Sequence, residues 1–131
     1  MQNLLELKPT MDDIERLQPF VAQTAEKAGI VGREAKRLRL AVEEAVANVI
    51  NYGQATVITL RAATDAGRLV LTIDDDGQPF DPTQDSPTDL TVPADERPPG
   101  GLGIILLHQM TDRLSYQRLD GHNVLRIEKM A

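Results

Sequence analysis

Two neighbouring segments of this 131-residue chain have the alternating hydrophobic pattern of β-strands, and very little separates them. In residues 55–63 Ile58 and Leu60 fall on one side, and residues 68–76 repeat the alternation. The connection at residues 65–67 is a turn that contains a glycine, and a link this short joins antiparallel strands. The pattern predicts a β-hairpin, and the chain lacks the strand–helix alternation of a Rossmann fold.

Two segments that precede this hairpin repeat their apolar residues with the period of a helix. The first runs to about residue 28, and Thr10 or Asp12 can cap its beginning. Its apolar stripe consists of Ile14, Leu17, Val21 and Ala25. The second spans about residues 33–52 and stops at Gly53. Its stripe consists of Leu38, Val42, Ala45, Val46 and Val49.

The remaining segments complete a single domain over residues 1–131. The pattern predicts a strand over residues 2–8 and a third helix that ends at about Thr111. It also predicts that the chain closes with a hairpin of residues 114–119 and 123–129. This order favours an α+β fold. We expect a two-layer sandwich whose sheet is mixed but largely antiparallel, with the helices on one face.

Residues 81–100 differ in composition from the rest of the chain. The segment holds five of the eight prolines and five acidic residues, without hydrophobic periodicity. Structureless loops longer than about 12–15 residues are usually functional or disordered. The composition therefore predicts a mobile loop or lid.

Composition also excludes several classes of function. The chain has no cysteine, so it has no disulfide scaffold, thiolate zinc site or cysteine nucleophile. A net charge of −6 argues against a dedicated nucleic-acid binder. No run approaches the roughly 20 apolar residues of a membrane span, and the N-terminus does not have the pattern of a signal peptide. We therefore expect a cytoplasmic protein.

Basic residues nevertheless gather between positions 27 and 39: Lys27, Arg33, Lys36, Arg37 and Arg39. We interpret them as the solvated face of a helix, and a docking surface for an acidic partner is the alternative. His108 and His122 have no ligand-type spacing. We expect a surface or packing role for both.

Glu44 and Asn48 lie one helical turn apart in the second predicted helix, on a face that also includes Ala41 and Asn51. An amide oxygen is a hard ligand for Mg²⁺, and a carboxylate can accept a proton from a nucleophile. Taken alone, however, this spacing is more typical of a solvated polar face.

Asp75 is the second candidate, in the run Asp74-Asp75-Asp76-Gly77. By the period of two it shares the apolar side of its strand with Leu71 and Ile73, where a carboxylate needs hydrogen-bond donors. The amino group of adenine is a suitable donor, and Gly77 lets the backbone pass close to a flat ligand. An acidic turn explains the run equally well.

The third candidate is the glycine-rich sequence at residues 100–103, which opens the third helix. Unpaired N–H groups at such a helix start can bind phosphate, and a loop hinge is the alternative. The sequence is not a P-loop, because no Lys-Ser/Thr follows it.

In this order the three features resemble the N, G1 and G2 boxes of the Bergerat-fold (GHKL) ATPases, over essentially the whole chain. The segments AVEEAVANVINYG, DDGQPFDP and GGLGIILLHQMTD look most like those of the stand-alone anti-sigma-factor serine-protein kinases. Many relatives have a histidine where this chain has Tyr52, so the resemblance assigns no role to Tyr52. It implies six site residues: Glu44 as general base, Asn48 as magnesium ligand, Asp75 and Gly77 at adenine, and Gly101 and Gly103 at the phosphates.

The resemblance further implies a serine/threonine-protein kinase that acts as an anti-sigma factor. Such a protein would bind a sigma factor, use Mg-ATP to phosphorylate an anti-anti-sigma antagonist, form a homodimer, and close residues 81–100 over ATP as a lid. One alternative is a nucleotide-gated protein-binding module with little or no kinase activity. A kinase whose pathway does not end in a sigma factor is another.

Overall fold

The structure is a computed structural model that describes residues 2–65, 67–81 and 107–131. Its elements, in chain order, are β1 (Gln2–Leu7), the 3₁₀ helix η1 (Asp13–Arg16), α1 (Leu17–Lys27), α2 (Gly32–Tyr52), β2 (Ile58–Asp65), β3 (Arg68–Asp75), β4 (Arg113–Leu119) and β5 (His122–Met130). Residues 107–110 are also helical and contribute buried Leu107 and Met110 to the core. The predicted lid beyond Asp81 and the start of the third helix lie outside the described residues.

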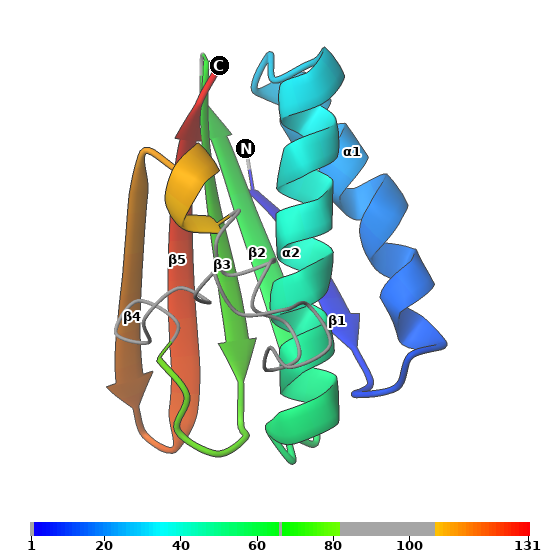
Figure 1. The fold of residues 1–131 in the computed structure, drawn as a ribbon, viewed down its shortest axis with the longest axis vertical. Coiled ribbons are helices and arrows are strands. Elements are labelled where there is room, and N and C mark those ends of the chain that lie inside the picture. The colour runs from blue at the N-terminus through cyan, green and yellow to red at the C-terminus, as the bar shows by residue number, and fades with distance from the viewer. Residues whose placement is uncertain (1, 66, 82–106) are drawn as a thin grey trace, which may run out of the picture.

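The strands form one five-stranded sheet in the order β1-β2-β3-β5-β4. Every pair of neighbours is antiparallel, so the described sheet is antiparallel rather than mixed. In Figure 1, α1 and α2 lie side by side along one face of the sheet. The predicted α+β two-layer fold is confirmed.

Alternation along the strands determines which side chains meet the helices. In β3, Leu71 and Ile73 are buried and Asp75 lies on the same inner face, as the period of two predicts. β1 follows the same rule, because Leu7 is buried and Leu4 is 64% exposed on the other side. Each large apolar side chain buried on the inner face contributes about 1.5–3 kcal/mol to stability.

The helical region differs from prediction in two details. The first helix is divided into η1 and α1, and the Thr10 hydroxyl accepts a hydrogen bond from the Asp13 N–H (3.3 Å) while Asp12 makes no capping bond. Ala41, expected on the polar face of α2, is fully buried. That expectation was wrong because α2 packs against both the sheet and α1, which widens its buried stripe.

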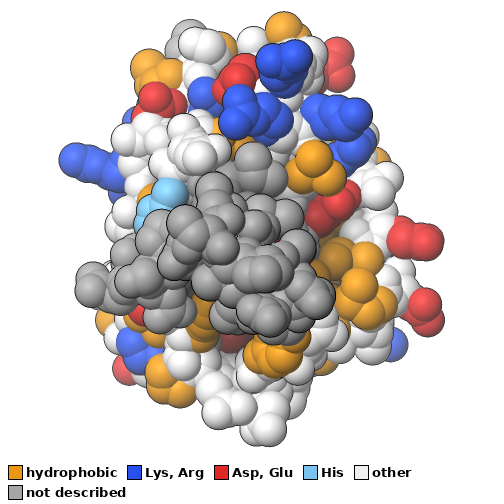
Figure 2. Space-filling model, in the orientation of Figure 1, with side chains coloured by type: hydrophobic (Ala, Val, Ile, Leu, Met, Phe, Trp, Pro, Cys, Tyr) orange, Lys and Arg blue, Asp and Glu red, His pale blue; other side chains and the backbone are white. Residues whose placement is uncertain are grey.

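The predicted basic cluster lies at the beginning of α2 and the end of α1. Figure 2 shows Lys and Arg side chains gathered at the end of the molecule where α2 begins in Figure 1. Arg37 pairs with Glu34 (3.8 Å) and Arg39 with Glu43 (3.8 Å), whereas Lys36 is exposed. None of the helices in the described part of the chain is long and apolar enough to cross a membrane.

Candidate functional site

A cavity of about 540 Å³ lies between the C-terminal half of α2, the end of β3 and the β4–β5 hairpin; we call it the Asp75 cavity. Much of its described wall is apolar and consists of Ala45, Val49, Ile73, Phe80, Leu107 and Leu125. Asn48, Asp75 and Asn123 are among its polar lining residues. An apolar cavity with a few fixed polar groups is typical of a small-molecule site.

Asp75 is the buried carboxylate of this cavity, with only 3% of its surface exposed. Its Oδ1 atom accepts hydrogen bonds from the Gly77 N–H (2.9 Å) and from the Asn123 side-chain amide (3.1 Å). Among the described residues no donor contacts Oδ2. The carboxylate therefore has one oxygen held by the protein and one that can accept a hydrogen bond from a ligand.

Burial raises the pKa of Asp75 above its ordinary value of 3.8. The hydrogen bonds from Asn123 and Gly77 oppose this rise in pKa, and the negative charges of Asp74 and Asp76 add to it. A ligand N–H directed at Oδ2 would favour the ionised form in the same way as these two donors. The raised pKa thus reflects burial that the two neutral donors do not fully offset.

Asn123 is a functional candidate that our sequence reasoning missed. It lies on β5 directly opposite Asp75 in the strand register and is 6% exposed. Its amide donates to Asp75 and to the Gln78 carbonyl (2.6 Å), and its oxygen accepts from the Phe80 N–H (3.2 Å) and the Tyr116 hydroxyl. Asn123 therefore fastens the loop after β3 to the last hairpin. Only the register, which pairs residues 48 positions apart, reveals this role.

Gly77 is required by the protein itself. A Cβ at this position would overlap the carbonyl oxygen of Gly53, which accepts a hydrogen bond from the Gln78 N–H (2.7 Å). Gly53 is needed in turn, because its own Cβ would lie 2.7 Å from the Val49 carbonyl oxygen. The two glycines bring the loop after β3 against the end of α2. This close approach, and not only room for a flat ligand, explains Gly77.

The two neighbours of Asp75 have other partners. Asp76 accepts hydrogen bonds from the Thr56 N–H (2.6 Å), the Thr56 hydroxyl and the Val57 N–H (3.1 Å), which lower its pKa to about 2. On the outer face of the sheet, Asp74 lies 2.6 Å from Nδ1 of His122. Of the three consecutive aspartates, Asp75 is the one that lines the cavity.

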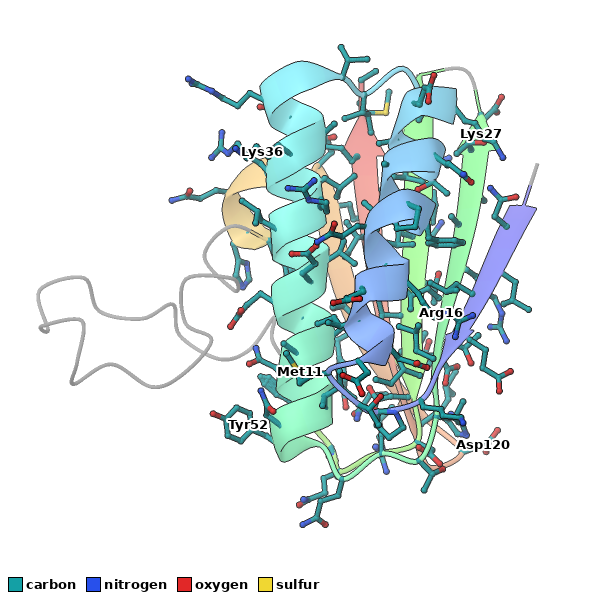
Figure 3. The ribbon with its side chains drawn as sticks, turned by 90° about the vertical axis from the view of Figure 1, so that its right-hand side faces the viewer. Met11, Arg16, Lys27, Lys36, Tyr52 and Asp120 are labelled. Atoms are coloured by element: carbon teal, nitrogen blue, oxygen red, sulfur yellow. The ribbon has the colours of Figure 1, made fainter. Side chains whose placement is uncertain are left out.

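Asn48 and Glu44 occupy the same helix but line different depressions. Asn48 lines the Asp75 cavity, as does Tyr52, which is 56% exposed at the end of α2 (Figure 3). Glu44 lines a second hollow of about 300 Å³, formed by α2, η1, the start of α1 and Met11, which we call the Met11 hollow. Gly101 and Gly103 lie outside the described residues.

Comparison with known proteins shows the family. Residues 7–129 match the model of the histidine kinase-like ATPase domain. The chain belongs to this family. It is therefore an ATP-binding domain of the kinase or ATPase type, which agrees with the predicted use of ATP.

Individual relatives of this histidine kinase-like ATPase domain agree with the match. A serine/threonine-protein kinase, BtrW from Bordetella bronchiseptica, is 34% identical over 94 residues. The alignment covers 69% of this chain and 66% of BtrW, slightly less than two thirds of its length.

Solved histidine kinase structures share the fold. The histidine kinase domain of a blue-light activated kinase from Erythrobacter litoralis has a TM-score of 0.56 at 19% identity, with 89% of this chain and 60% of that chain covered. The Acinetobacter baumannii kinase AdeS has a TM-score of 0.54 at 13% identity, with 98% and 67% covered. At these identities the likeness shows the fold alone.

The donor set of this histidine kinase-like ATPase domain is compatible with Mg²⁺ that arrives with a nucleotide. In residues 2–65, 67–81 and 107–131 no group of three or more His, Cys, Asp or Glu side chains could hold a metal ion. Mg²⁺ is commonly held by one or two protein oxygens together with phosphates and water. The Asn48 amide in the cavity wall is such an oxygen donor, so the residues fit the predicted metal.

Proposed function

We propose that this domain is a serine/threonine-protein kinase, which transfers the γ-phosphoryl group of ATP to a hydroxyl group of a protein. The observation that carries the proposal is the convergence of Asp75 and Asn48 on one cavity, although they come from a strand end and a helix far apart in sequence. Further support comes from the relative BtrW, which is a serine/threonine-protein kinase.

Each residue has a distinct role in this proposal. Oδ2 of Asp75 accepts a hydrogen bond from the adenine amino group, while Ile73, Leu125 and neighbouring apolar side chains exclude water from the base. Asn48 would hold Mg²⁺ through its amide oxygen, and the bound metal would neutralise phosphate charge. By resemblance, Gly77 also contacts the base and Gly101 and Gly103 bind the phosphates.

Phosphoryl transfer requires positioning, charge neutralisation and a base for the attacking hydroxyl. The hydroxyl oxygen attacks the γ-phosphorus, and a new O–P bond forms as the bond to the β–γ bridging oxygen breaks. ADP leaves with that electron pair, and the hydroxyl proton goes to the Glu44 carboxylate. Glu44 lies one helical turn before Asn48, so the base in the Met11 hollow and the metal ligand in the Asp75 cavity are neighbours along α2.

The partners in this proposal follow the resemblance of the three sequence boxes. The acceptor would be an anti-anti-sigma protein, the sequestered partner a sigma factor, and the active form a homodimer. An acidic surface of one such partner would meet the exposed cations at the start of α2, such as Lys36.

The test is incubation with radiolabelled Mg-ATP and candidate acceptor proteins. Glu44→Gln should keep nucleotide affinity and lose phosphoryl transfer by roughly 10²–10⁴-fold. Glu43→Gln is the matched control, since Glu43 is the adjacent carboxylate in the Met11 hollow and pairs with Arg39. A Glu44→Gln protein that transfers phosphate at the normal rate would exclude Glu44 as the base. A wild-type protein that binds ATP and partner without transfer would be a nucleotide-gated binding module.

A further inference from the structure

The position of Glu44 indicates the side from which a protein acceptor approaches. Glu44 lines the Met11 hollow, whereas Asn48, one turn later on α2, lines the Asp75 cavity. A base must lie within hydrogen-bond reach of the hydroxyl that it deprotonates. If Glu44 acts as proposed above, an acceptor hydroxyl reaches it from the Met11 hollow, and the γ-phosphoryl group of a nucleotide in the Asp75 cavity must extend past Asn48 toward Glu44.

The hollow has an apolar part that is unusually exposed. Met11 is 52% exposed and Leu40 is 41% exposed, and both line the hollow with Ile14 and Ala47. Figure 3 shows Met11, which precedes η1, beside the C-terminal half of α2, the helix that ends at Tyr52. Large apolar side chains gathered at a concave surface are typical of a protein-binding site.

Apart from Gln18, the remaining wall is acidic. Glu15, Glu43 and Glu44 line the hollow. Of these three, only Glu43 forms an ion pair among the described residues, with Arg39 at 3.8 Å. The two atoms of the Arg39–Glu43 pair, Nε of Arg39 and Oε1 of Glu43, are buried and lie too far apart for a hydrogen bond. The hollow therefore presents uncompensated negative charge around apolar side chains.

We propose that the Met11 hollow is the docking site of the phosphoacceptor segment of a protein substrate. The segment that fits it has a serine or threonine next to a large apolar side chain and a lysine or arginine. The apolar side chain contacts Met11 and Leu40, the cation lies near Glu15, and the hydroxyl faces Glu44. This inference rests on the proposed kinase function and adds the chemistry by which the acceptor is selected.

The test uses two fluorescently labelled synthetic peptides with the cores Leu-Ser-Lys and Leu-Ser-Glu. The first should bind the Mg-ADP-loaded protein at least about tenfold more tightly, and Glu15→Lys should reverse the order of the two peptides. The preference should weaken as salt rises, because exposed charges are screened. Anisotropy titrations measure both effects. Equal affinities, no binding of either peptide, or an unreversed order in Glu15→Lys would overturn the proposal.

A matched pair of variants tests the apolar part. Met11→Lys should weaken the Leu-Ser-Lys peptide about tenfold, whereas Met130→Lys, at a methionine that is 51% exposed on β5, should not change it. An equal response of the two variants would count against the docking site. Binding with the expected preferences but without phosphate transfer would support the docking surface and refute the kinase. Phosphate transfer to a protein acceptor at a rate that neither Met11→Lys nor Glu15→Lys changes would support the kinase and refute the docking surface.

Discussion

Among the described residues two carboxylates are buried, and they lie on opposite faces of the same sheet. Glu128, on the outer face, is surrounded by Arg68, Arg113 (3.8 Å) and Arg126 (4.0 Å), and the hydrogen bond from Arg68 lowers its pKa. Asp75, on the inner face, accepts hydrogen bonds from two neutral groups of the described residues, the Gly77 N–H and the Asn123 amide, and its pKa is raised by burial. The first carboxylate is satisfied by arginines, whereas no donor in the described part of the chain contacts Oδ2 of the second, which a ligand can use. Burial alone therefore does not identify a functional carboxylate, because its hydrogen-bond and ion-pair partners determine whether a ligand can still bind it.

The comparison predicts that only one of these carboxylates matters for nucleotide binding. Asp75→Asn should weaken Mg-ADP by roughly 30- to 150-fold, about 2–3 kcal/mol, because a charge-assisted hydrogen bond is lost. Glu128→Gln should leave the affinity unchanged and lower the melting temperature by a few degrees. Isothermal calorimetry at neutral pH measures the affinities. A comparable loss of affinity in both variants would remove the distinction between the two carboxylates.

The next prediction concerns the residue that orients Asp75. Asn123→Leu should lower Mg-ADP affinity about tenfold, since it removes the donor to Oδ1 and releases the loop at Gln78 and Phe80. Tyr116→Phe, which deletes only the hydroxyl bonded to Asn123, should have a smaller effect. The pH at which affinity is lost should rise in Asn123→Leu, because the hydrogen bond from Asn123 lowers the pKa of Asp75. An unchanged pH profile would reduce Asn123 to a packing residue.

The sequence predicted the inner-face position of Asp75 because a strand has a period of two, and the neighbouring Leu71 and Ile73 fix its phase. Helix α2 and both hairpins were predictable for the same local reason: periodicity and turn glycines act over a few residues. The α+β class followed from the order of the elements.

What could not be predicted depends on contacts between distant segments. Asn123 becomes part of the site only through its register with Asp75, and Gly77 is needed because Gly53 lies against it. Likewise, the location of Glu44 in the Met11 hollow depends on how η1 packs on α2. The roles of Glu44, Asn48, Asp75 and Gly77 toward a nucleotide remain predictions.

Acidification should change folding stability in opposite directions through the two buried carboxylates. The pKa of Asp75 is above 3.8, so the folded state takes up this proton first and gains stability as pH falls toward that value. The pKa of Glu128 is below 4.5, so the unfolded state takes up that proton first and stability is lost as pH falls below about 4.5. Relative to wild type, stability should fall more steeply in Asp75→Asn and less steeply in Glu128→Gln. Urea unfolding from pH 7 to pH 3 measures how steeply the free energy of unfolding changes with pH. If both variants deviated from wild type in the same direction, the opposite pKa shifts given to Asp75 and Glu128 would be contradicted.

The smallest expected effect concerns Asp76, which is next to Asp75 in sequence but bonded to the start of β2. Its pKa of about 2 is below the ordinary 3.8, so its contribution to stability is present above about pH 4 and is lost as pH falls toward 2. Asp76→Asn should flatten this part of the acid-unfolding curve and leave Mg-ADP affinity unchanged. A loss of affinity similar to that of Asp75→Asn would place Asp76 in the nucleotide site.

The most direct measurement of the central claim compares two nucleotides that differ at one position of the base. Mg-ADP carries an amino group at C6, whereas Mg-IDP carries a carbonyl oxygen, which the free Oδ2 of Asp75 would repel. Calorimetry on the wild-type protein should therefore show Mg-ADP bound at least about 30-fold more tightly than Mg-IDP, and Asp75→Asn should remove most of this preference. Equal affinities of the wild-type protein for the two nucleotides would contradict the account.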